Sequence, residues 1–65
     1  MKIRVEVYPN EYVRLMRGRL ELTQSELAQR LGIARGSLTR YEIGESPIPA
    51  VTIRAIEHMA DEVLP

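Results

Sequence analysis

Apolar and charged residues alternate over residues 2–8 and then change to a helical spacing. Ile3, Val5 and Val7 fall on one face of an extended segment, which predicts a short β-strand that ends at Pro9. Because a lone strand leaves its backbone groups unpaired, we expect it to pair with a second copy in an antiparallel homodimer. The alternatives are a disordered arm and an edge strand folded on the chain's own helices.

The segment that follows predicts a first helix over about residues 11–19. Asn10 is expected to cap its N-terminus, and Tyr12, Leu15 and Met16 are expected to enter the core. A last helix is expected from about residue 49 or 50 to residue 61. Its predicted core-facing residues are Val51, Ala55, Ile56 and Met59.

Residues 23–42, TQSELAQRLGIARGSLTRYE, predict two short helices joined by a glycine turn. Thr23 and Glu26 have the spacing of a capping box at the start of the first of them. The apolar stripe of the pair, which Gly32 interrupts, consists of Leu27, Ala28, Leu31, Leu38 and Tyr41. Ala28 is small enough to let two crossing helices approach closely.

This pattern resembles the phage repressor and Cro family of helix-turn-helix regulators, the xenobiotic-response-element type. The resemblance extends from about Glu11 to Met59. Its motifs, in chain order, are Thr23-Gln24, Glu26-Leu27-Ala28, Leu31-Gly32-Ile33, Ser37-Leu38-Thr39-Arg40-Tyr41-Glu42, Gly44 and Pro47-Ile48-Pro49. It implies an all-α, compact repressor-like domain of four to five helices over residues 10–65, preceded by the strand or arm of residues 1–9.

The resemblance also implies that the helix near Arg35 to Tyr41 lies in the major groove of DNA. The residues expected to face bases are Arg35, Gly36 and Arg40, and those expected to contact phosphate are Thr23, Gln24, Ser37 and Thr39. For Ser37 and Thr39 the alternative is contact with a thymine methyl group, and Ser37 could also simply face solvent. A guanidinium at Arg35 can donate two hydrogen bonds to guanine O6 and N7. For Arg40, a contact to phosphate alone is the alternative.

Two further features follow from the same resemblance. Arg17 and Glu42 stand where family members form a structural ion pair between the first helix and the reading helix. Three positions depart from the family pattern: Ala34 lacks a capping side chain, Gly36 offers none to a base, and Glu45 is acidic near the DNA backbone. Weak binding per monomer is therefore expected.

The formal net charge of the 65 residues is zero, but the charges are divided along the chain. Residues 1–40 hold eight Lys or Arg and four Glu, giving +4, while residues 41–65 hold one Arg and five acids, giving −4. The basic half carries the motif that would read DNA. Individual Arg residues could instead simply solvate helix faces.

Composition argues against catalysis. The chain has no cysteine and a single histidine, His58, so no usual zinc site or nucleophile-base pair can form. We expect no enzyme activity, no metal, no cofactor and no small-molecule effector. No apolar run approaches the length of a membrane span, and a cytoplasmic protein is expected.

The sequence thus predicts a transcriptional regulator, a repressor that binds a short palindromic operator in double-stranded DNA as a homodimer. The alternative is a protein-interaction module on the same fold, such as an antitoxin or an anti-repressor, because fold alone does not fix function.

Overall fold

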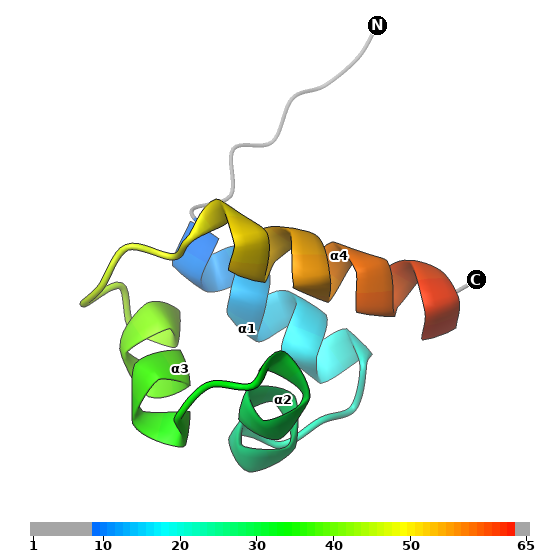
Figure 1. The fold of residues 1–65 in the computed structure, drawn as a ribbon, viewed down its shortest axis with the longest axis horizontal. Helices are drawn as coiled ribbons and strands as arrows, with labels where there is room; N and C mark the ends of the chain where they lie inside the picture. Colours follow the sequence, from blue (N-terminus) through cyan, green and yellow to red (C-terminus); the bar gives the residue numbers. More distant parts are fainter. Residues whose placement is uncertain (1–8, 64–65) are drawn as a thin grey trace, which may run out of the picture.

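The computed structural model describes residues 9–63, which form four α-helices and no strand (Figure 1). The helices are α1 (Pro9–Arg19), α2 (Gln24–Leu31), α3 (Arg35–Glu42) and α4 (Ala50–Val63). The prediction of an all-helical domain with four helices is confirmed for this part of the chain. The predicted strand with Ile3, Val5 and Val7 lies outside the described residues.

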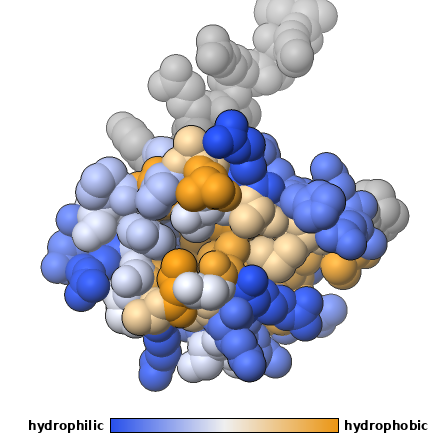
Figure 2. Space-filling view, viewed as in Figure 1, coloured by the Kyte–Doolittle hydropathy of each residue, from blue (hydrophilic) through white to orange (hydrophobic). Residues whose placement is uncertain are grey.

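Each helix buries one face against two others. α1 packs against α3 and α4, and α2 packs against the same two helices, so that the four enclose one core (Figure 1). The side chains that form this core are Val13, Met16, Leu27, Ala28, Leu38, Ile56 and Ala60. Hydrophobic side chains also gather over the middle of the face in Figure 2, because many apolar residues around the core are only partly buried.

Two apolar residues expected in the core are exposed. Leu15 keeps 54% of its surface in solvent and Val51 keeps 66%. At 100° per residue, Leu15 lies about 200° around α1 from the fully buried Val13, and Val51 lies about 140° around α4 from the buried Ile56. Both predictions are wrong, because the buried face of each helix includes fewer of its apolar residues than the sequence indicated.

The N-terminus of α1 also differs from the prediction. The helix begins at Pro9, and Asn10 therefore lies inside the helix and does not cap it. Proline suits this position because the first N–H groups of a helix have no intrahelical acceptor, so the missing N–H of proline costs no hydrogen bond. The Asn10 Nδ2 instead donates to the backbone carbonyl of Glu42, at 3.5 Å. The Glu42 carbonyl is available because the last carbonyls of a helix lack intrahelical partners. The bond therefore links the start of α1 to the end of α3.

The predicted capping box of α2 is present. The Thr23 hydroxyl accepts from the Glu26 backbone N–H at 3.1 Å, and the Glu26 carboxylate accepts from the Thr23 backbone N–H at 2.8 Å. The start of α3 is different, since Ala34 occupies the cap position and makes no side-chain hydrogen bond. The expected absence of a side-chain cap at this end of α3 is therefore confirmed.

The first three helices end in the same way. Each is followed by a residue in the left-handed conformation: Glu21 with φ 57°, Gly32 with φ 71° and Gly44 with φ 79°. In each case the next residue donates its N–H five residues back along the chain, as Leu22 does to the Arg17 carbonyl at 3.1 Å. Two of the three turns use glycine, which adopts this conformation without strain, and the first does not.

Candidate nucleic-acid interface

The outer face of α3 consists of residues opposite to its buried Leu38. Gly36, Arg40 and Ile43 lie on that side and are exposed, and Arg35 is exposed at the start of the helix. Leu38 anchors this arrangement because it is fully buried between the helices. The packing of α3 thus fixes which of its side chains can reach another molecule.

Two shallow hollows lie on this part of the surface. The α3 hollow, of about 500 Å³, is lined by Arg35, Gly36, Thr39, Arg40, Ile43 and Glu45. The α2 hollow, of about 520 Å³, lies beside the N-terminus of α2 and is lined by Arg17, Thr23, Gln24, Ser25 and Arg35. Arg35 borders both hollows, so it stands between the start of α2 and the outer face of α3.

The Glu42 carboxylate lies beneath this surface and binds side chains of α1 and α2. Only 3% of its surface is exposed, and it accepts from Arg17 Nε at 2.7 Å and from Arg17 Nη2 at 3.0 Å. Arg17 also donates from Nη1 to the Leu22 carbonyl at 3.2 Å. The hydrogen bond to Glu42 raises the pKa of Arg17 above its ordinary value, so the guanidinium stays charged. The predicted pair is therefore a bidentate, largely buried ion pair.

The same carboxylate fixes Gln24, the predicted phosphate contact. Gln24 Nε2 donates to Glu42 Oε1 at 3.1 Å, and Gln24 Oε1 lies 3.4 Å from the Thr39 hydroxyl. That hydroxyl also donates to the Arg35 carbonyl at 3.0 Å. Gln24 at the start of α2 is thus linked to two residues of α3: to Thr39, and to Glu42, which belongs to the buried ion pair.

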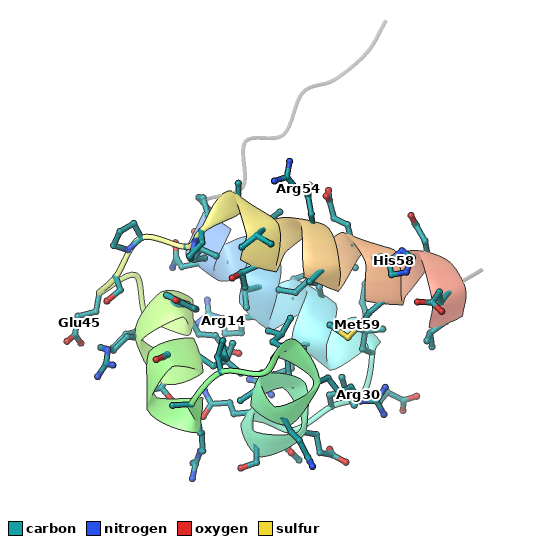
Figure 3. All side chains as sticks on the ribbon, viewed as in Figure 1. Arg14, Arg30, Glu45, Arg54, His58 and Met59 are labelled. Atoms are coloured by element: carbon teal, nitrogen blue, oxygen red, sulfur yellow. The ribbon has the colours of Figure 1, made fainter. Side chains whose placement is uncertain are left out.

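The surface carries charges of both signs, and its exposed arginines, Arg35 and Arg40, are not engaged in ion pairs within the described residues. Among residues 9–63 the ion pairs are Arg17 with Glu42 and His58 with Glu62, so neither Arg35 nor Arg40 has an acidic partner there. Two carboxylates lie close by: Glu26 at the start of α2, and Glu45 on the loop after α3 (Figure 3). Arg35, an unpaired guanidinium group beside the N-terminus of α2, can bind an anion such as phosphate, and Arg40 adds a second positive charge at the other end of α3.

A comparison with protein families agrees with this geometry. A family model described as a helix-turn-helix domain matches residues 11–61, which contain α2, α3 and the turn between them. The chain belongs to the helix-turn-helix domain family. This membership makes it a DNA-binding domain of the regulator type. No curated protein and no solved structure matches the chain.

The helix-turn-helix unit brings most of the predicted site residues together. Arg35, Gly36, Arg40 and Thr39 line the α3 hollow, and Thr23 and Gln24 line the α2 hollow. Ser37 is half-buried on another side of α3 and borders neither hollow, so the geometry does not favour its predicted phosphate contact.

Sequence reasoning missed two residues at this helix-turn-helix surface. Ile43 is an apolar side chain with 61% of its surface exposed, and it lies at the end of the α3 hollow. Its position seven residues after Gly36 was the available signal, because that spacing returns to the same helix face. Ser25 borders the α2 hollow, and a serine in the first turn of a helix gave no distinctive signal.

The remaining chemistry of the helix-turn-helix domain is sparse. No cluster of three or more potential metal ligands occurs within residues 9–63. His58 is exposed on α4, at the opposite end of the molecule from α3 (Figure 3). In the same part of the chain, no helix has both the length and the apolar character to span a membrane.

Proposed function

We propose that this helix-turn-helix domain is a sequence-specific transcriptional repressor of the phage repressor and Cro type. In this proposal α3 enters the major groove of a short palindromic operator, and the N-terminus of α2 rests on the DNA backbone. The observation that carries it is the position of Arg35, an exposed guanidinium without an acidic partner in residues 9–63 that borders both hollows.

Each residue of the surface has a distinct role in the proposal. Arg35 donates two hydrogen bonds to a guanine, which defines sequence, and Arg40 reads an outer base or binds phosphate. The side-chain amide of Gln24 has two hydrogens; one binds Glu42, and the other contacts phosphate. The Thr23 hydroxyl, which accepts from the Glu26 backbone N–H in the capping box, lies at the exposed start of α2 and is the second proposed phosphate contact.

The proposed homodimer rests on the sequence of residues 2–8, which lie outside the described residues. Antiparallel pairing centred on Val5 would set Ile3 opposite Val7 of the second copy, and Arg4 opposite Glu6. A twofold dimer would present two copies of α3 to successive turns of the same DNA face, about 34 Å apart. Repression is the proposed outcome because a small protein bound across a promoter excludes polymerase.

Selection of bound DNA from a random duplex pool tests the proposal directly. Because phosphate contacts weaken steeply with salt, the selection is best run at about 150 mM salt. The wild type is expected to enrich a palindromic motif containing a guanine. Arg35→Ala should lose the preference at that guanine and about 5- to 100-fold in affinity, the value of one bidentate contact.

Arg54→Ala is the matched control, because Arg54 is also exposed and its loss changes the net charge equally, but it lies on α4 (Figure 3). It should keep the motif of the wild type. An equal loss in the two variants would show that Arg35 contributes only charge. The absence of any enriched motif in the wild type would instead favour a protein-interaction module.

A further inference from the structure

The fold does not require a glycine at position 36. Gly36 lies within α3 without a positive φ, and a Cβ built there meets no heavy atom within 4 Å. Glycine weakens a helix interior relative to alanine, so this residue costs α3 stability without relieving any contact inside the molecule. The space above Gly36 is therefore open to another molecule.

The α3 hollow around Gly36 has an apolar floor between two cations. The Thr39 hydroxyl donates to the Arg35 carbonyl at 3.0 Å, and the methyl group of the same side chain is apolar. Ile43 closes the far end of the hollow and is exposed over 61% of its surface. Arg35, Arg40 and Glu45 complete the hollow, so an apolar group bound there would have a guanidinium group on either side and one carboxylate nearby.

We infer that the α3 hollow receives the C5-methyl group of a thymine, with Gly36 supplying the space and Ile43 the apolar contact. This inference rests on the proposed function and adds a base to it. The thymine methyl is the apolar group that base edges present in the major groove, and adjacent phosphates would match the flanking arginines. An exposed isoleucine at the end of a reading helix thereby gains a specific role.

Replacement of thymine by uracil tests the inference, since uracil differs only by the missing methyl group. The probe is the duplex that the wild type selects from the random pool, with each thymine replaced singly by uracil. At one position the wild type should lose about fourfold in affinity, as expected for one buried methyl group. Ile43→Ala should bind the thymine and uracil duplexes almost equally. Its Tm should stay close to that of the wild type.

Gly36→Ala tests the space above the helix, and Gly18→Ala is its matched control. Gly18 also lies in a helix, at an exposed position where a Cβ would meet nothing within 4 Å, and it borders neither hollow. Both variants should raise the Tm by a few degrees, because alanine favours the helix. Only Gly36→Ala should weaken binding to the thymine duplex, by at least fourfold.

The outcomes separate the inference from the proposed function. If Arg35→Ala loses the guanine preference but every uracil duplex binds like its thymine counterpart, the methyl contact is overturned and the proposed function stands. Unchanged uracil sensitivity in Ile43→Ala, or full affinity in Gly36→Ala, also overturns it. If the wild type selects no DNA, both fall together.

Discussion

Glu42 receives hydrogen bonds from three different residues of the domain. Its carboxylate accepts from two nitrogens of Arg17 and from Gln24, and its backbone carbonyl accepts from Asn10. The pair with Arg17 was predicted from the resemblance, but the bond to Gln24 was not. Glu42 therefore both stabilises the fold and positions a proposed phosphate contact.

We predict that Glu42→Ala lowers the free energy of unfolding by about 3–5 kcal/mol, because it strands a largely buried guanidinium without its partner. Glu62→Ala removes the exposed pair with His58 and should change stability by about 0.5 kcal/mol or less. Urea denaturation followed by circular dichroism measures both. A loss for Glu42→Ala as small as that for Glu62→Ala would contradict the structural role.

At the scale of the helix, the ends rather than the interiors distinguish one element from another. α2 has a complete capping box and a glycine after its last turn, whereas α3 starts at Ala34 without a side-chain cap. α1 ends in the left-handed turn with Glu21, where a side chain is strained. Stability can thus be gained at the ends of α1 and α3 without changing the core.

Glu21→Gly should stabilise the protein by about 0.5–1 kcal/mol. Relief of left-handed strain contributes about 1–2 kcal/mol, and the greater freedom of glycine in the unfolded chain offsets about half of it. Glu21→Ala is the control, because it removes the same carboxylate but keeps a Cβ at φ 57°. Thermal denaturation should show a gain for glycine only. An equal gain in both variants would assign the effect to charge.

The capping box makes α2 sensitive to acid. Hydrogen bonds from Thr23, first from its backbone N–H and then from its hydroxyl, lower the pKa of Glu26 below the ordinary value of 4.5. A carboxylate with a lowered pKa stabilises the fold fully above its unfolded pKa, and this contribution is lost as the pH falls through the folded pKa. The neutral acid form accepts these bonds more weakly than the carboxylate does.

We therefore predict that the Tm difference between wild type and Glu26→Gln is largest above the ordinary pKa of a glutamate and vanishes as the pH falls through the lowered pKa of Glu26. Melting curves across this range measure it, and the other carboxylates cancel because both proteins contain them. A difference that stayed constant with pH would show that the charge of Glu26 contributes nothing to the cap.

Over the whole molecule, three acidic residues lie on α4, away from the α2–α3 surface. Arg35 and Arg40 lie at that surface together with Glu26 and Glu45, while Glu57, Asp61 and Glu62 lie on α4. A net charge of zero is therefore compatible with two unpaired guanidinium groups at the proposed interface, which attract DNA phosphates.

Salt dependence shows whether Arg40 contacts phosphate or a base. If Arg40 binds phosphate, Arg40→Ala should reduce the slope of log K against log salt by about 0.9 and leave the selected motif unchanged. Arg54→Ala, with the same change in net charge, should leave the slope unaltered. A changed motif with an unchanged slope would make Arg40 a base reader instead. Fluorescence anisotropy at several salt concentrations measures the slope.

The sequence predicted the four helices because each has a regular apolar spacing, and the start of α2 was also clearly marked. Thr23 with Glu26 marked the start of α2, and Leu27, Ala28 and Leu38 were correctly placed in the core. It could not determine which apolar residue of a helix faces outward, as with Leu15 and Val51, since that depends on where the neighbouring helices lie.

The sequence also did not predict the polar contacts between residues far apart in the chain. Gln24 and Glu42 are eighteen residues apart, and Asn10 and Glu42 are thirty-two apart, so nothing in the local spacing joined them. The exposed Ile43 was overlooked because apolar residues are expected inside. Arg17 and Glu42 were paired only through the family resemblance, not through any property of the two positions themselves.

The contacts of Glu42 also affect whether α3 can unfold separately from the rest of the domain. α3 has eight residues, an uncapped start and a glycine, so it would not persist as a helix alone. Its last residue is joined by side-chain hydrogen bonds to α1 and α2. Amide hydrogens in the middle of α3 should therefore exchange with solvent only when the whole domain unfolds, at the same rate as those of α1.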